Sequence, residues 1–193
     1  MTTLTAVHAG LGSPSSTELL AGRLTASAQR LLPDARVRTV HLRDLARDVA
    51  DNLVTGFPSA RLREALAEVV DADALIAVTP TFNASYSGLF KSFVDVLDPG
   101  SLEGKPVLIG ATGGSERHSL VLDHAMRPLF AHLKAIVLPT GVYAASSDWG
   151  AEGLPGRIDR AAGELADLLT GRPAPAKRSG EDFVPFDRLL AER

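Results

Sequence analysis

Short apolar runs alternate with segments of helical period along most of this chain. The apolar runs span residues 4–9, 37–42, 74–79, 106–111 and 136–142. Amphipathic helical patterns follow them over residues 20–31, 62–70, 89–97, 122–133 and 157–169. Such alternation is typical of a parallel sheet whose strands are connected by helices.

Five such units predict a flavodoxin-like α/β fold, an open five-stranded parallel sheet of order 2-1-3-4-5 with helices on both faces. We expect one domain over residues 1–170, because the whole chain of 193 residues is close to the ~150 of an average domain. Ligands of these sheets bind outside the carboxyl ends of the strands. The loops after strands one, three and four are therefore the candidate site.

The composition excludes several classes of protein. No cysteine is present, which removes disulfides, thiolate nucleophiles and cysteine-based metal sites. A net charge of -3 with both signs interspersed argues against nucleic acid and anionic membranes as partners. No apolar run approaches the ~18 residues that span a bilayer, and the chain does not open on a secretion signal. We expect a cytoplasmic protein that binds small molecules or other proteins.

Residues 171–193 differ in composition from the rest, being rich in proline, glycine and charge. This pattern predicts an extended C-terminal arm. It ends in an apolar cluster that would be costly to leave in water, so the arm either docks on a protein surface, such as a second subunit, or frays as an ordinary terminus. The cluster comprises Phe183, Val184, Phe186, Leu189 and Leu190.

The loop after the first strand reads GLGSPSST and places four hydroxyl residues at the start of a helix. Unpaired N–H groups and the helix dipole favour an anion there. The loop lacks the Gly-Lys-Ser/Thr of a Walker A motif, and Ser15 stands where a dinucleotide fingerprint has its third glycine. It suits a phosphomonoester such as that of FMN, or it only caps the helix. The hydroxyl residues are Ser13, Ser15, Ser16 and Thr17.

The loop over residues 80–88 combines aromatic, amide and hydroxyl side chains at the end of a strand with a fully buried pattern. Its backbone could read the polar edge of an isoalloxazine, while Phe82 and Tyr86 offer contact to a ring or to a neighbouring subunit. An ordinary surface loop is the alternative.

The loop Thr112-Gly113-Gly114-Ser115 lets a backbone approach a ligand closely, and Arg117 behind it could meet a nucleotide phosphate or stay solvated. The chain contains no nucleophile beside a base, no G-x-S-x-G elbow and no metal-binding histidine spacing. We therefore expect no metal site and no catalytic side chain of the acyl-transfer or metal-hydrolysis kind.

The succession of GLGSPSST, TPTFNASYSGLFKSFVD and ATGGSERHSLVLDHAMRPLF resembles the NADPH-dependent FMN reductases. The likeness covers roughly residues 4–170. It is strongest with the branch that supplies reduced flavin to two-component monooxygenases of the alkanesulfonate and luciferase-like type. The resemblance implies a dimeric or tetrameric flavodoxin-like enzyme that passes a hydride from NADPH or NADH to FMN.

The resemblance also implies roles for the three loops. The four hydroxyl residues of the first loop would hold the FMN phosphate, and Arg117 would lie near the nicotinamide nucleotide. Since the flavin carries out the hydride chemistry, no catalytic side chain is needed, and small residues must leave room for the nicotinamide. Gly113→Val should therefore abolish flavin reduction and leave the fold largely intact. The ribityl chain and ring would contact Pro80, Thr81, Phe82, Asn83 and Ser85, and the ring's polar edge would contact Thr112, Gly113, Gly114 and Ser115.

Two positions depart from the pattern of these reductases. In alkanesulfonate-type members an inserted aromatic residue produces a π-helical turn at a subunit interface, and His124 stands at the matching position here. Pro128 gives a local reason for an irregular helix as well. Glu18 replaces an arginine common in relatives, which weakens the phosphate site electrostatically.

Two other functions fit the same residues. One is a quinone or azo reductase that keeps FMN tightly bound, which a yellow purified protein would indicate. The other is a flavodoxin-like electron carrier without a nicotinamide site, although the strongly acidic surface of such carriers is missing at a net charge of -3.

Overall fold

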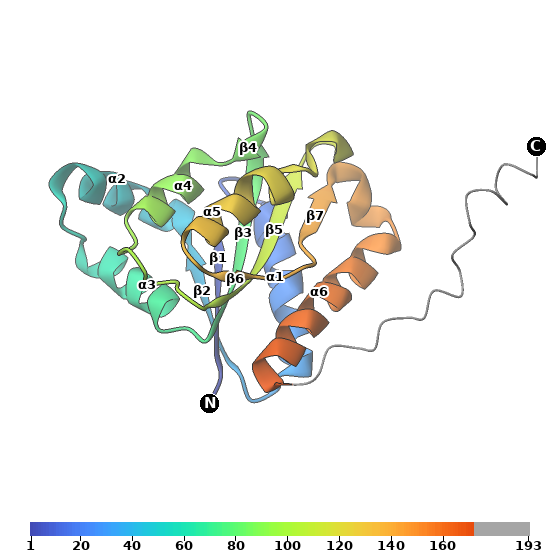
Figure 1. The fold of residues 1–193 in the computed structure, drawn as a ribbon. Helices are drawn as coiled ribbons and strands as arrows, with labels where there is room; N and C mark the ends of the chain where they lie inside the picture. The colour runs from blue at the N-terminus through green and yellow to red at the C-terminus, as the bar shows by residue number, and fades with distance from the viewer. Residues whose placement is uncertain (172–193) are drawn as a thin grey trace, which may run out of the picture.

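A computed structural model describes residues 1–171, in which one sheet lies between two layers of helices (Figure 1). The order of its main strands is β2-β1-β3-β5-β6, with β4 paired to β3 and β7 paired to β5. All pairs are parallel except β3 with β4. The strands are β1 (Thr3–His8), β2 (Arg36–His41), β3 (Ala74–Phe82), β4 (Ser85–Tyr86), β5 (Pro106–Gly113), β6 (Ile136–Val137) and β7 (Val142–Ala145).

The helices connect these strands and cover both faces of the sheet (Figure 1). The α-helices are α1 (Ser16–Leu31), α2 (Ala46–Thr55), α3 (Ala60–Val70), α4 (Gly88–Asp95), α5 (Arg127–His132) and α6 (Gly153–Thr170). The 3₁₀-helices are η1 (Leu42–Leu45), η2 (Glu116–His118) and η4 (Ser146–Gly150), and η3 (Leu122–Met126) is a π-helix.

Successive residues of the central strands point to opposite faces, so the sheet has two apolar cores. On one face, Leu75 and Ile109 pack with residues of α2, α3, α4 and α5. On the other face, Ile76 and Leu108 pack with α1 and α6. The flavodoxin-like prediction is confirmed, including the order 2-1-3-4-5 when the strands are counted as the five predicted ones.

The fifth predicted strand, 136–142, is interrupted and forms β6 and β7. Pro139 lies in the interruption and has no N–H to donate to a neighbouring strand. Backbone groups at the interruption bond to side chains instead of to a neighbouring strand. The Arg127 guanidinium donates to the carbonyls of Leu138 and Pro139 at 2.9 and 3.0 Å. The Thr140 N–H donates to the Glu164 carboxylate at 2.9 Å.

Two further elements differ from the prediction. Residues 46–55, for which no helix was predicted, form α2, which ends at Gly56 with φ 77°. Only Val49 of this helix is buried, so its apolar pattern is weak. The loop predicted over 80–88 is instead partly extended, because β3 continues to Phe82 and turns into β4.

The irregular helix expected near His124 is present. The Arg127 N–H donates to the carbonyl of Leu122, five residues earlier, which is the π-helical pattern. Pro128 follows directly in the first turn of α5 and has no N–H with which to continue the π-helical bonding pattern. The π-helix therefore ends where the proline-initiated helix begins.

Residue 171 follows the end of α6. The predicted arm and its cluster Phe183–Leu190 lie outside the described residues, and their docking stays a prediction. Among the helices of residues 1–171, none has the length and apolar content needed to cross a membrane.

Candidate functional site

The three predicted loops leave the sheet at the same edge. In the parallel register, His8 of β1 lies opposite Val78 of β3. Pro80 of β3 lies opposite Thr112 of β5. The carboxyl ends of β1, β3 and β5 are thus adjacent, so the loops that follow them surround one region at this edge.

The first loop is shaped by the start of α1. Ser15 is the N-cap, and its Oγ accepts the Glu18 N–H at 3.2 Å. Gly10 is required because a Cβ there would lie 2.2 Å from Ser15 Oγ. Ser13 and Ser16 are exposed, so their hydroxyls remain available to a ligand.

A cation that sequence reasoning missed reaches this loop. Arg43 of η1 donates from Nη1 to the carbonyl of Gly12 at 3.4 Å. Since η1 follows β2 and β2 lies beside β1, the strand order places Arg43 next to the predicted phosphate loop. The predicted strand order 2-1-3 puts the second strand beside the first, and an arginine stands just after the second predicted strand. These two facts together could have predicted that Arg43 lies near the first loop.

Thr17 behaves differently from the other hydroxyl residues. It is 2% exposed, and its Oγ1 lies 2.8 Å from Thr112 Oγ1. This buried pair joins the start of α1 to the end of β5, so two of the predicted loops are in direct contact. A role for Thr17 at the phosphate stays a prediction.

The second loop is a tight hairpin. Thr81 pairs with Tyr86 and Phe82 with Ser85. The turn is made by Asn83 and Ala84, with φ of 48° and 65°, as in a type I′ turn. The hairpin leaves Phe82 48% exposed, beyond the carboxyl end of the main sheet, and Asn83 at the exposed tip.

Tyr143 links the second and third loops, and sequence reasoning missed it because it lies just past the predicted strand. Its hydroxyl donates to the Ser115 carbonyl at 2.8 Å. A Cβ on Gly113 would lie 2.1 Å from this hydroxyl and 3.6 Å from Thr81 Cβ. Burial raises the pKa of Tyr143 although its contact with Thr81 acts the other way, so the hydroxyl stays protonated as a donor at neutral pH.

The same geometry corrects the prediction that Gly113→Val leaves the fold largely intact. A side chain at Gly113 meets the largely buried Tyr143, whereas one at Gly114 meets nothing within 4 Å. Gly114 therefore borders open space, and Gly113 makes room for the tyrosine.

A surface hollow of about 310 Å³ joins the hairpin to the region after β5. Of the predicted residues it brings together Ser85 and Arg117, and it adds the imidazoles of His118 and His124. On the outer side of η2, the Ser147 hydroxyl bonds Glu116 and holds the pKa of that carboxyl below its usual value. A hollow lined by apolar, hydroxyl and basic side chains suits a polar, anionic molecule with a flat ring.

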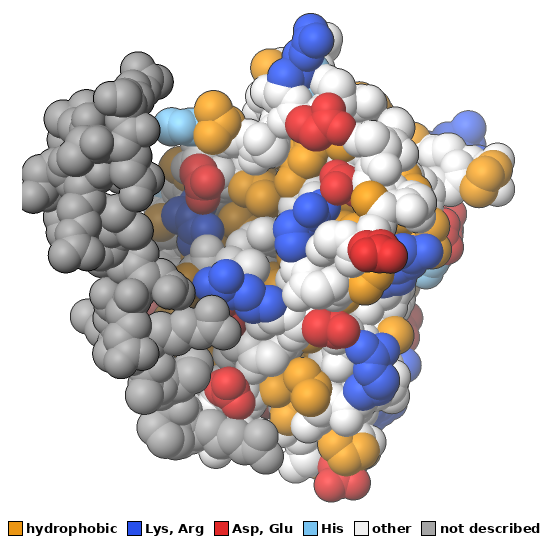
Figure 2. Space-filling model, turned by 90° about the vertical axis from the view of Figure 1, so that its right-hand side faces the viewer, with side chains coloured by type: hydrophobic (Ala, Val, Ile, Leu, Met, Phe, Trp, Pro, Cys, Tyr) orange, Lys and Arg blue, Asp and Glu red, His pale blue; other side chains and the backbone are white. Residues whose placement is uncertain are grey.

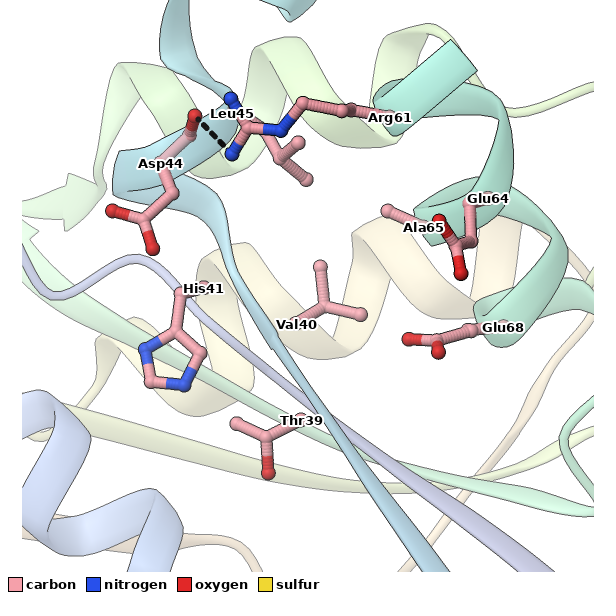
Figure 3. A pocket seen from close by; sticks show the side chains of 9 residues that line it. All are labelled: Thr39, Val40, His41, Asp44, Leu45, Arg61, Glu64, Ala65 and Glu68. Carbon is pink, nitrogen blue, oxygen red and sulfur yellow. Dashed lines mark hydrogen bonds between the residues drawn. The ribbon is translucent and has the colours of Figure 1, made fainter.

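Two other parts of the surface lie away from these loops. The hollow drawn in Figure 3 is lined by β2, η1 and α3 and includes none of the predicted flavin-binding residues. Over the part of the α6 side described by the structure, acidic and basic side chains are interspersed without a continuous patch of one sign (Figure 2). This distribution agrees with the net charge of -3.

The family model for NADPH-dependent FMN reductases matches residues 2–150 of the chain. This protein belongs to the NADPH-dependent FMN reductase family. An FMN reductase (NADPH) of Pseudomonas aeruginosa is 42% identical over 173 residues, which are 86% of this chain and 92% of that one. The NADH-dependent FMN reductase SfnF of Pseudomonas fluorescens is 39% identical over 169 residues, 85% and 90% of the two chains.

Solved structures agree with this assignment. The X-ray structure of an oxidoreductase from Corynebacterium diphtheriae is 41% identical, with a TM-score of 0.86 over 90% of this chain and 99% of that one. The apo form of an NADH:FMN oxidoreductase is 28% identical, with a TM-score of 0.77 over 95% and 100% of the two chains. The predicted family, the reductase reaction and the pairing of FMN with NADPH or NADH are confirmed.

Proposed function

We propose that FMN binds across the edge formed by the loops after β1, β3 and β5, and that the reduced flavin is passed to a partner monooxygenase. The contact between Thr17 and Thr112 at 2.8 Å carries this proposal, because it brings the predicted phosphate loop and the predicted ring loop to one place. The convergence of these loops at the carboxyl edge is the arrangement in which open α/β sheets bind ligands.

The phosphate end of FMN fits the first loop. Ser13 and Ser16 present free hydroxyls at the start of α1, and the N-cap Ser15 lies between them. Arg43, in contact with Gly12, supplies a positive charge that offsets Glu18. A phosphate held by hydroxyls, N–H groups and one nearby cation binds reversibly, which suits a flavin that is released to another enzyme.

The ring end fits the second and third loops. Thr81 has a buried Oγ1 without a hydrogen-bond partner among the described residues, and the exposed Phe82 offers an apolar contact to a ring. Gly114 leaves open space at the end of β5. We propose that Pro80, Thr81, Phe82, Asn83 and Ser85 line the ribityl chain and ring, and that Thr112, Gly113, Gly114 and Ser115 face its polar edge.

When bound, FMN supplies the chemistry by accepting a hydride from reduced nicotinamide. The protein has to orient the two nucleotides and keep water out. The Tyr143 hydroxyl donates to the Ser115 carbonyl and would hold the third loop in position. Arg117, at the hollow beside the hairpin, would pair with a phosphate of the nicotinamide nucleotide.

We propose a cytoplasmic homodimer or homotetramer. The cytoplasm is where NADPH and NADH are replenished. Phe82 is exposed on the hairpin, and His124 and Ala125 of the π-helix η3 line the hollow at Ser85 and Arg117; an adjoining subunit would cover both surfaces. The names of relatives such as SfnF, an NADH-dependent FMN reductase, support reduced FMN as the product.

The test is nicotinamide oxidation by flavin-stripped protein, with NADPH and NADH each offered FMN, FAD and riboflavin. We expect a rate that rises with added FMN and saturates. A protein that stays yellow through purification and reduces quinones instead would favour the tightly bound alternative. FMN binding without any nicotinamide oxidation would overturn the reductase function.

A further inference from the structure

His8 is a buried histidine whose ring has no hydrogen-bond partner among residues 1–171. It ends β1 with 2% of its surface exposed, and neither ring nitrogen is bonded to any described residue. Leaving a buried polar group unpaired destabilises a fold. Such a residue in a native fold calls for a ligand or another explanation.

Two further side chains converge on it. His41 lies opposite His8 in the parallel register of β1 and β2, and the two rings meet edge to face with their centroids 4.4 Å apart. Glu18 comes from the first turn of α1. One ligand atom from each of the three residues can be chosen so that all lie within 4.8 Å of one another.

These three residues line a surface hollow of about 350 Å³, separate from the hollow at Ser85 and Arg117. Thr25 also lines it, and its Oγ1 is buried without a partner among the described residues. In Figure 3 the His41 imidazole lies beside Asp44 and apart from Glu64 and Glu68, at the end of β2. The hollow thus combines two imidazoles, a carboxylate and a spare hydroxyl.

We infer that His8, Glu18 and His41 form a binding site for a divalent transition-metal cation of the zinc class. Two histidines and one carboxylate are a known zinc ligand set, with a fourth position for water. Nitrogen ligands disfavour Mg²⁺ and Ca²⁺. In a tetrahedral site, ligand atoms about 2.1 Å from zinc lie about 3.4 Å from one another. The side chains at the surface must therefore move roughly 1 Å closer to the other ligands to bind the ion.

The surroundings favour a cation. Glu18 and Asp44 both act on His8 as negative charges, so the site offers a cation more negative than positive charge from its nearest groups.

The experiment uses the full-length chain without a histidine tag, freed of metal with EDTA. Zinc is titrated by calorimetry, and Co²⁺ is used as a spectroscopic substitute whose visible bands report tetrahedral nitrogen and oxygen ligands. We expect one equivalent per chain, and a loss of affinity on the order of 100-fold in Glu18→Gln and in His41→Ala.

The chain supplies a matched control in two of its three remaining histidines, His118 and His124, which lie on other elements. The double variant His118→Ala/His124→Ala should bind zinc as the wild type does. His8→Leu should abolish binding and raise the melting temperature of the metal-free protein, because it removes two unpaired buried nitrogens. If His8→Leu fails to fold, the other two variants still decide. Wild-type affinity in Glu18→Gln and His41→Ala, no binding at micromolar zinc, or loss of binding only in the control variant would each overturn the site.

Discussion

The hydroxyls of Thr17 and Thr112 are 2.8 Å apart, buried, and separated by 95 residues of chain. The pair joins the helix that follows β1 to the end of β5. Since each hydroxyl can donate to the other, neither is left unpaired at the base of the candidate site.

Replacing one member of this pair should destabilise the fold. Thr17→Val or Thr112→Val leaves the other buried hydroxyl unpaired, and we expect each to lower the free energy of unfolding by about 1–3 kcal/mol. The double variant should lose less than the sum of the two. Urea denaturation measures all three, with the exposed Thr55→Val as control. Strictly additive losses would show that the two hydroxyls are not coupled.

The two adjacent glycines should respond differently to alanine. Gly113→Ala forces the Tyr143 hydroxyl, 2.1 Å from the new Cβ, off the Ser115 carbonyl, which lowers the melting temperature. Adding Tyr143→Phe should recover part of that loss. Gly114→Ala should change stability by less than about 0.5 kcal/mol, whereas Gly114→Val should weaken FMN binding about tenfold. Unchanged FMN affinity in Gly114→Val would place the ring elsewhere.

Charges next to the first loop should change FMN affinity in opposite directions. Arg43→Ala removes the cation that contacts Gly12, and Glu18→Gln removes an anion from the first turn of α1. In EDTA-treated protein at low salt, we expect Arg43→Ala to weaken FMN binding about two- to fivefold and Glu18→Gln to tighten it by a similar factor. Riboflavin, which has no phosphate, is the control. The same changes for riboflavin would separate these residues from the phosphate.

Asp148 should contribute to acid stability. Partial burial acts to raise its pKa, but the hydrogen bonds from Arg157 and the Ala145 N–H hold it below the usual 3.8. Because the folded-state pKa is the lower one, this stabilisation is present above about pH 4 and is lost as the pH falls through the folded value. Asp148→Asn should be less stable at pH 6 and show a smaller loss between pH 5 and 3. Chemical denaturation across that range measures it, and parallel curves for both proteins would contradict the prediction.

Most of the sheet follows from local patterns in the sequence. The central strands are continuous apolar runs because both of their faces are buried, and Leu75 and Ile76 contribute to opposite cores. Helix α2 was not predicted because only Val49 is buried and Leu53 and Val54 face solvent. The extension of β3 through Pro80 was missed because proline usually ends a strand.

For the candidate site, the loops that form it were predicted, but the contacts between those loops and other elements were not. The hydroxyl-rich first loop and the glycines after β5 are visible in the sequence, but Arg43 and Tyr143 reach the site from η1 and β7. The same holds for His8 and His41: no spacing along the chain relates them, and only the register of β1 with β2 brings their rings together. Contacts between elements distant in sequence depend on topology, which local periodicity does not report.

The register of Val78 with His8 and of Pro80 with Thr112 has a consequence for catalysis. Hydride transfer demands that two rings meet within a few tenths of an ångström, and mobile loops alone would meet that demand only transiently. Here each loop is anchored to a strand buried on both faces. The spacing between these anchors is that of the sheet, so we expect the candidate site to be preorganised before any nucleotide arrives.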